Sequence, residues 1–486
     1  MEYDTPSTST GASARRCGNR TKYTVSKRRI PAAHTLHQRP TVMEGLLLSA
    51  FETMARTNPM RVCFAAVDAD GHDVPYGYQQ TRLMSAAIAW RLQEFGARKG
   101  SYVMVDLPNI AIYPLLVLAG AYGGFGLVLM DYQLPPQEKE ARKLVFSRDL
   151  GDDLVFCIDK TNVLPLMRWA IDFLAGKHEV RTQEEGSLGA NLTQRTMGGK
   201  SPNGRAGSFR FSGGGQIARG NSGANRANQS KNAQDTCVHF AERQGHLFNL
   251  NAPAFIFTAT DARGRMRAVC HSWRSILANT QAANEALAAD RMAVWQCVLP
   301  LWTVEGMQVV LRGLAGCNSF VLYRRFDANQ VLKDVRRYRV THIAVDTQRL
   351  AKLLDVGSAE FAQYACVLVD CGKAARRSDV RIFKAARRAS NHVRLAYGTA
   401  ETAGMVAVED DLVEDEGGNG MVCAMRPLSG CDLQVSNPDG QGFGALSVRT
   451  AGMFDGYLDG QSPRMRNGFF ITGDEAALYR ERLYLR

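Results

Sequence analysis

The chain has 486 residues, 45% of them hydrophobic, so it can bury a large core and is expected to fold as more than one unit. No apolar run approaches the roughly 20 residues that a membrane-spanning helix needs, and the basic residues 1–31 lack the apolar stretch of a secretory signal. The eleven cysteines are scattered singly without a CxxC pair, which favours a reducing, cytoplasmic setting and argues against disulfides or a zinc site.

The formal net charge of +12 is concentrated in two segments. Residues 1–40 carry eight Lys or Arg against two acids, and residues 186–234 carry seven Lys or Arg and no acid. The rest of the chain is therefore close to neutral. A basic stripe on a folded face, the usual mark of nucleic-acid binding, is not indicated, and no specific nucleic-acid partner is expected. We expect residues 1–40 to form a basic, disordered tail.

The first folded unit is expected over residues 41–184, where short apolar runs alternate with helical patterns. Strands are predicted at 62–68, 102–108, 127–131 and 153–159, and helices at 79–97, 113–126 and 135–148. The segment 185–247 is rich in Gly, Asn, Ser and Arg and poor in aliphatic residues. It is expected to be a disordered insertion, because it offers little apolar surface to offset the entropy of ordering.

The alternation resumes after the insertion, over residues 248–405. Strands are predicted at 254–260, 293–302, 319–326, 341–346, 366–371 and 393–398, separated by helices or turns. Buried apolar strands that alternate with helices predict an α/β fold with doubly wound parallel sheets. From residue 406 the chain changes to short alternating strands with Asn-Pro-Asp-Gly turn chemistry, which predicts a β-rich, barrel-like subdomain over 406–486.

Three short stretches follow one another in an informative order. The first is FIFTATDARGRMRAVCHSW (255–273), an apolar strand followed by a turn with hydroxyl and basic residues and then a helix-like start. The second is LAYGTAETAG (395–404), a strand that runs into a turn carrying Glu401. The third is NGFFITGDEAALY (467–479), a strand that ends at Thr472-Gly473-Asp474. Each is weak alone, because such turns are common and a single carboxylate at a strand end is usually solvated.

Taken together and in this order, the stretches resemble the adenylate-forming superfamily of acyl-CoA synthetases. The resemblance extends over residues 41–486, interrupted by the basic insertion. Residues 96–138 are similar to the family's first-half signature, and residues 298–354 are similar to its segment after the phosphate loop, nearest to o-succinylbenzoate–CoA and fatty-acid–CoA ligases. The resemblance implies the family's large N-terminal domain: two α/β subdomains and a smaller β subdomain.

The resemblance also implies a reaction and its cofactors. Family members use ATP and Mg²⁺ to convert a small carboxylic acid to an acyl-adenylate and then form a thioester with CoA. Tyr397 and Gly372 would flank the adenine, with Gly398 next to them. Asp474 would bond the ribose hydroxyls, and Glu401 would hold Mg²⁺.

The remaining expected contacts come from two further motifs. The family's phosphate loop resembles TSGTTGxPK, and its positions match Thr260, Gly264 and Arg267 here. The acyl and CoA route would run past Trp302, Thr303 and Gly306. Of these residues, Glu401, Arg267 and Thr260 would act in catalysis.

Several residues depart from the family pattern. Asp261 stands where the family has a glycine, and most loop glycines that let backbone N–H groups converge on phosphate are missing. Arg263 and Arg265 add charge without restoring that backbone geometry. Ala400 replaces the hydroxyl residue expected before Glu401. Thr303 stands where ligases usually carry a histidine.

Three interpretations stay open. The chain ends at ERLYLR, where the family's hinge begins, so a separate C-terminal lid polypeptide is one expected partner of an acid-activating ligase. The degenerate loop instead favours a nucleotide- or acyl-binding regulatory module without turnover. The third interpretation assigns function to the Arg-rich insertion, as an RNA- or membrane-surface-binding segment.

Overall fold

The computed structural model describes residues 46–177, 223–260, 265–357, 359–370, 377–409 and 424–485. All of them fall in one compact unit that spans residues 39–486. The expected disordered tail at 1–40 lies outside the described residues, as do residues 178–222 of the expected insertion. Within the described ranges, none of the helices combines the length and the apolar character that crossing a bilayer requires.

A six-stranded sheet collects strands from both halves of the chain. Its order is β17-β7-β6-β4-β3-β5. Strands β3, β4, β5 and β6 are parallel to one another, and β7 pairs antiparallel with both β6 and β17. The strands are β3 (Tyr102–Asp106), β4 (Gly126–Leu129), β5 (Leu154–Asp159), β6 (Pro253–Thr260), β7 (Met266–Ser272) and β17 (Gly456–Tyr457).

A larger sheet of 14 strands runs in the order β15-β16-β19-β20-β14-β13-β12-β11-β10-β8-β9-β1-β2, with β18 paired to β19. Its central strands, from β12 to β1, are parallel, and the rest are antiparallel. The parallel strands and the hairpin partner of β1 are β1 (Val62–Val67), β2 (Asp73–Gly77), β8 (Val294–Cys297), β9 (Ser319–Tyr323), β10 (His342–Asp346), β11 (Cys366–Asp370) and β12 (Val393–Thr399). The antiparallel end consists of β13 (Gly404–Glu409), β14 (Met425–Pro427), β15 (Cys431–Ser436), β16 (Gly444–Thr450), β18 (Met465–Arg466), β19 (Phe469–Tyr479) and β20 (Arg482–Leu485).

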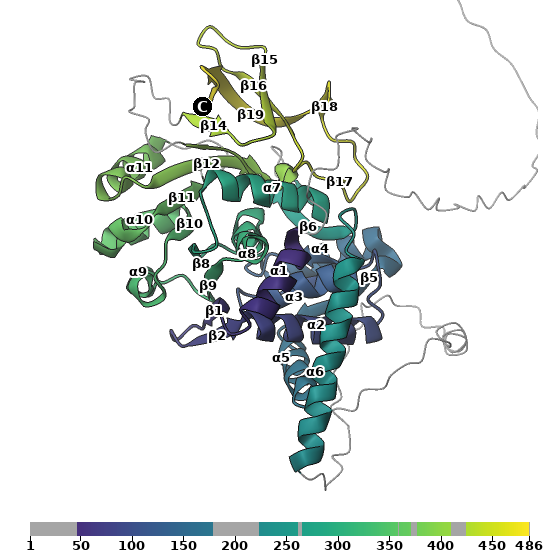
Figure 1. The fold of residues 1–486 in the computed structure, drawn as a ribbon. Coiled ribbons are helices and arrows are strands. Elements are labelled where there is room, and N and C mark those ends of the chain that lie inside the picture. The colour runs from purple at the N-terminus through teal and green to yellow at the C-terminus, as the bar shows by residue number, and fades with distance from the viewer. Residues whose placement is uncertain are drawn as a thin grey trace, which may run out of the picture. The chain divides into compact units, whose positions relative to one another are not determined.

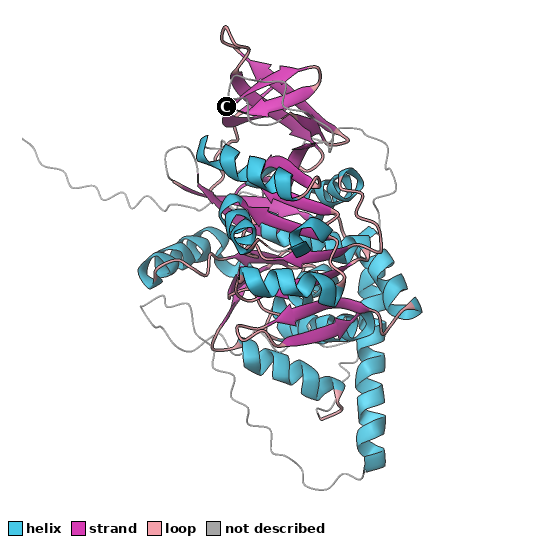
Figure 2. Ribbon diagram, turned by 90° about the vertical axis from the view of Figure 1, so that its left-hand side faces the viewer, coloured by secondary structure: helices cyan, strands magenta, loops and turns pink. Residues whose placement is uncertain are grey.

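Helices cover both sheets, as Figures 1 and 2 show. They are α1 (Leu46–Thr57), α2 (Tyr78–Glu94), α3 (Ile112–Gly123), α4 (Pro136–Leu150), α5 (Val163–Leu174), α6 (Gly223–His246), α7 (Trp273–Ala286), α8 (Val304–Gly316), α9 (Ala328–Tyr338), α10 (Thr347–Val356) and α11 (Arg377–Ala389). Every residue of α3 is buried, as its unbroken apolar sequence predicts. The mixed α/β fold class predicted from the sequence is confirmed.

The expected division at the insertion is not the division between the sheets. β1 and β2 come from the first half of the chain but join the larger sheet, where Phe64 of β1 pairs with Phe320 of β9. β6 and β7 come from the second half but join the smaller sheet. Strand patterns alone do not reveal this exchange, because an apolar run fits a buried position in either sheet.

The expected disorder over 185–247 is wrong for its last part, which forms helix α6. Its buried side chains recur at helical spacing, at Ala233, Cys237, Phe240 and Ala241, and α6 packs against α2 and α5. Small residues and one cysteine form most of this stripe, so counting aliphatic residues missed it.

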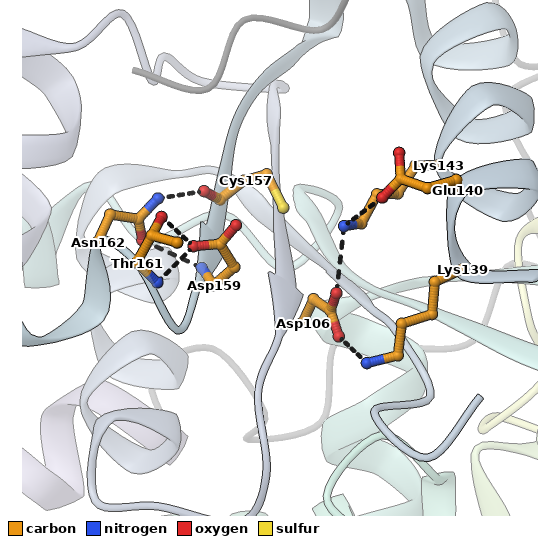
Figure 3. A network of polar contacts seen from close by, with 8 residues as sticks. All are labelled: Asp106, Lys139, Glu140, Lys143, Cys157, Asp159, Thr161 and Asn162. Atoms are coloured by element: carbon orange, nitrogen blue, oxygen red, sulfur yellow. Dashed lines mark hydrogen bonds and ion pairs between the residues drawn. The ribbon is translucent and has the colours of Figure 1, made fainter. Parts of the chain in front are cut away.

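A polar network fixes helices α4 and α5 at the carboxyl end of the smaller sheet (Figure 3). Asp106, the last residue of β3, is 7% exposed and accepts from Lys139 at 2.8 Å and from Lys143 at 3.2 Å. At the end of β5, Asn162 donates to the backbone carbonyl of Cys157 at 2.8 Å. Two lysines on one buried carboxylate satisfy its charge, which holds α4 against the strand end.

Candidate functional site

The end of strand β12 brings together two of the residues expected to contact a nucleotide. Tyr397 is 1% exposed, and its hydroxyl donates to Asp474 Oδ2 at 2.7 Å. Burial raises the pKa of Tyr397, and the adjacent Asp474 raises it further, so the hydroxyl stays protonated and acts as a donor. Asp474 comes from β19, in the antiparallel part of the same sheet.

Gly398 follows Tyr397 at a close approach between two strands. A Cβ atom at this position would lie 2.0 Å from the backbone carbonyl oxygen of Gly404 in β13. Only glycine therefore fits where β12 bulges against β13 and turns toward Glu401.

The turn that carries Glu401 is held in place by groups from elsewhere in the chain. Its backbone carbonyl accepts from Phe454 N at 2.8 Å, and its Oε1 accepts from the Tyr457 hydroxyl at 2.9 Å. The preceding carbonyl, that of Ala400, lies 2.7 Å from Nε2 of His271 in β7. The carboxylate is therefore positioned by contacts to both the 454–457 segment and β7.

In the stretch expected to be a phosphate loop, an additional antiparallel strand, β7, lies between strand β6 and helix α7. Thr260 ends β6, and β7 pairs back along it before α7 begins at Trp273. Gly264 lies outside the described residues, as does Asp261. The helix begins near Trp273 as expected, but strand β7 before it was not predicted: the residues after the turn, MRAVCHS, pair antiparallel with β6.

Arg267 points from β7 to the residues that follow β17. Its Nη1 lies 3.2 Å from Asp459 Oδ2 and also contacts Gln461 Oε1. The guanidinium carbon lies 5.1 Å from the centroid of the Tyr457 ring, within the range of a cation–π contact. Tyr457 therefore touches both Arg267 and Glu401.

Tyr457, Asp459 and His271 were missed by the sequence reasoning. Each is an isolated residue in its own stretch, and its role comes only from the pairing of β17 with β7, where Tyr457 lies opposite Val269. His271 is 2% exposed, and burial lowers its pKa to about 4. No local pattern in the sequence indicates these contacts.

Residues expected on the acyl and CoA route gather where helix α8 begins. Thr303 caps the helix, accepting from Gly306 N at 3.2 Å. Gly306 cannot carry a side chain, because a Cβ there would lie 2.0 Å from Pro300 O. Trp302 is 7% exposed, and its ring lies 6.4 Å from that of Tyr132.

Next to these residues is a pocket between α8 and the ends of β10, β11 and β12. Its free volume is about 30 Å³, and Tyr397 and Gly398 belong to its lining. Glu305 and Arg312 line it from α8, and Asp370 lines it from β11. Gly372, expected on the adenine side, lies outside the described residues.

Arg312 is the unusual group in this pocket. It is 3% exposed, and its Nε has no hydrogen-bond partner among the described residues. Burial lowers its pKa to about 10, so it remains a cation at neutral pH. The pKa of Glu305 is raised, by burial first of all, and Arg312 opposes that shift. A buried cation without a full set of partners can bind an anionic ligand.

Glu401 offers the oxygen chemistry that Mg²⁺ prefers. Proteins usually hold Mg²⁺ with one or two carboxylates together with substrate phosphates, so a single positioned glutamate fits such a role. Among the described residues, a group of three ligand-type side chains close enough for one ion occurs at Asp68, Asp70 and His72, exposed in the β1–β2 turn.

Comparisons with known proteins identify relatives of this chain. The chain is 27% identical over 238 residues to 2-succinylbenzoate–CoA ligase of Staphylococcus aureus strain MSSA476, a match that covers 48% of this chain and 46% of that protein. The chain thus spans about half the length of the curated relatives it matches. The Staphylococcus aureus strain JH9 ligase gives the same identity and coverage.

Solved structures share the fold. An o-succinylbenzoate CoA synthetase from Bacillus subtilis, in complex with its acyl-adenylate intermediate, superposes with a TM-score of 0.64 at 17% identity, covering 90% of this chain and 76% of that one. The same enzyme in complex with AMP gives 0.64 at 18% identity, covering 90% and 97%. Nothing in these comparisons supports the expected separate lid polypeptide. The AMP-binding enzyme family matches residues 51–458, and the chain therefore belongs to that family.

Proposed function

We propose that this protein uses ATP to activate a carboxylic acid. A carboxylate oxygen attacks the α-phosphorus, the bond to the bridging oxygen breaks, and acyl-adenylate and pyrophosphate are formed. The observation that carries the proposal is the convergence of Tyr397, Asp474 and Glu401 at the end of β12, beside a pocket that opens on the same strand end. Attack of the CoA thiol on the acyl carbonyl, with AMP leaving, would complete a ligase reaction of the family type.

Each polar group has a separate part in this scheme. Asp474 accepts from the ribose hydroxyls, and Tyr397 shapes the surface against which the adenine lies. Arg267 faces the negative charge that grows on the phosphates in the transition state, with the Thr260 hydroxyl at the same strand end. Glu401 would hold Mg²⁺, which supplies neutralisation of phosphate charge when bound.

The pocket favours an acid that carries a second anionic group. Arg312 lies two helical turns after Glu305 on the same face of α8, about 10 Å further along the helix axis, and both line the pocket. A second anionic group of an acid bound in this pocket would meet the Arg312 guanidinium. The curated relatives act on 2-succinylbenzoate, by name, which fits this reading.

A specific observation favours a second candidate function, nucleotide binding without turnover. Arg267 already contacts an acid, Asp459, and the amide of Gln461. The β- and γ-phosphates of ATP would have to compete with these groups for the guanidinium. AMP lacks those phosphates, so its binding depends less on Arg267. Such a protein would bind AMP and fail to exchange pyrophosphate.

Pyrophosphate–ATP exchange with a panel of aryl and alkyl mono- and dicarboxylic acids decides between the two. We expect exchange that depends on the acid, is strongest with dicarboxylic acids, and falls about 100-fold or more in Glu401→Gln. Glu140→Gln, at a glutamate whose side chain is 70% exposed on α4, is the matched control and should retain wild-type exchange. AMP binding in calorimetry without exchange for any acid would support the second candidate instead.

A further inference from the structure

Tyr457 is the residue that joins the two charged groups of the candidate site. Glu401 follows β12 in the larger sheet, whereas Arg267 lies on β7 in the smaller one. The Tyr457 hydroxyl donates to Glu401 Oε1 at 2.9 Å, and its ring lies beneath the Arg267 guanidinium, with a carbon-to-centroid distance of 5.1 Å. One side chain thus contacts both groups through different atoms.

The backbone around Tyr457 is firmly tied to β7. Asp455 N donates to Cys270 O at 2.8 Å, and Leu458 N donates to Ala268 O at 2.9 Å, on either side of the Tyr457–Val269 pair. The ring also packs edge-to-face against Phe454, with centroids 4.9 Å apart. These contacts restrict the movement of the Tyr457 side chain. Its hydroxyl therefore holds the Glu401 carboxylate at a fixed position relative to β7.

We propose that Tyr457 is a positioning residue that orients Glu401 for a divalent cation and Arg267 for the phosphates of a nucleotide. The inference rests on the proposed function. By occupying Oε1 of Glu401, the tyrosine hydroxyl directs the other carboxylate oxygen to the cation. By lying against the guanidinium, the ring fixes the plane in which Arg267 can meet phosphate oxygens.

The two contacts can be separated by substitution. Tyr457→Phe removes the hydroxyl and keeps the ring against Arg267 and Phe454. Tyr457→Leu removes the hydroxyl and the ring face together. Tyr113→Phe is the matched control: this buried tyrosine on α3 also loses one hydrogen bond, to Leu107 O at 2.9 Å, in a pair that includes neither Glu401 nor Arg267.

The test measures metal and nucleotide binding as well as turnover, on the full chain. Mn²⁺ serves as the spectroscopic substitute for Mg²⁺, with its affinity in the presence of ATP read by electron paramagnetic resonance. ATP and AMP affinities are read by calorimetry without divalent cation, so that they report on the nucleotide contacts alone. Pyrophosphate exchange is measured against Mg²⁺ concentration.

We expect Tyr457→Phe to weaken Mn²⁺ affinity about tenfold, as the loss of a group that orients a metal ligand does, and to leave the ATP-to-AMP affinity ratio unchanged. Tyr457→Leu should lower that ratio as well, because Arg267 loses its support. Tyr113→Phe should change neither quantity, although it lowers stability. Wild-type Mn²⁺ affinity in Tyr457→Phe, with an active wild-type enzyme, overturns the inference alone. A wild-type chain that binds no ATP and exchanges no pyrophosphate overturns the proposed function and this inference together.

Discussion

His271 links the stability of this protein to pH. Its side chain is 2% exposed, and burial lowers its pKa from the ordinary 6.5 to about 4, against a smaller opposing effect of the Ala400 carbonyl. In the neutral ring Nε2–H donates to Ala400 O at 2.7 Å, and Nδ1 lies 2.9 Å from the Ser275 hydroxyl, which also lies 3.0 Å from Ser272 O. Protonation would place a charge in the buried core, which is unfavourable.

The size and sign of the effect follow from these pKa values. Above pH 6.5 the histidine is neutral in both the folded and the unfolded chain. Between pH 6.5 and 4 the unfolded chain takes up a proton that the folded chain does not, so stability falls as the pH falls. A difference of about 2.5 pH units corresponds to a loss of about 3 kcal/mol, complete near pH 4.

His271→Gln provides the measurement. Glutamine can still donate to the Ala400 carbonyl but does not titrate, so urea unfolding of both proteins from pH 7.5 to pH 4 isolates this histidine from other titrating groups. We expect the stability of the wild type relative to the variant to decrease by about 3 kcal/mol over that range. The same substitution at His72, whose side chain is 82% exposed, is the control and should show a much smaller change. Parallel curves for the wild type and His271→Gln would refute the reasoning.

Three substitutions test the packing, each by urea unfolding. Gly306→Ala should destabilise by about 3 kcal/mol or more because its Cβ would meet a backbone carbonyl at 2.0 Å, whereas Gly440→Ala, with nothing within 4 Å, should be nearly neutral. Phe240→Ala should cost about 3–5 kcal/mol and increase hydrogen exchange in α6, while Leu247→Ala, 54% exposed, should cost little. Arg82→Met should cost about 3–5 kcal/mol, because it removes the cation paired with buried Glu52 and leaves that carboxylate with the Tyr122 hydroxyl as a donor; a smaller loss would mean that water reaches Glu52.

The strands of the α/β part could be predicted because buried parallel strands are short, apolar and bounded by turns. Sheet membership could not, because the register of β1 with β9 depends on residues more than 250 positions apart. Helix α6 could not be predicted from its aliphatic content, because its buried face is formed largely by Ala233, Cys237 and Ala241, which lack long aliphatic side chains.

In the candidate site, too, residues in local motifs could be predicted, whereas residues brought together by tertiary pairing could not. Tyr397, Glu401 and Asp474 could be predicted from ordered motifs, and the structure brings Tyr397 and Asp474 into contact. Tyr457 and His271 act through atoms that meet only when β7 pairs with β6 and β17, a tertiary event with no local sequence signal. The roles of the motif residues in binding and catalysis stay predictions.

The exchange of strands between the two sheets has a consequence for biosynthesis. In strand β1, Phe64 pairs with Phe320 of β9. The β9-facing edge of β1 therefore stays unpaired until the ribosome has added more than 250 further residues. At roughly 5–20 residues per second that wait is on the order of 13–50 s. During that time β1 presents an unpaired edge on which another nascent chain could add a strand. Yield in a recombinant host should therefore depend on translation rate and chaperone supply, and fragments that end before β9 should aggregate.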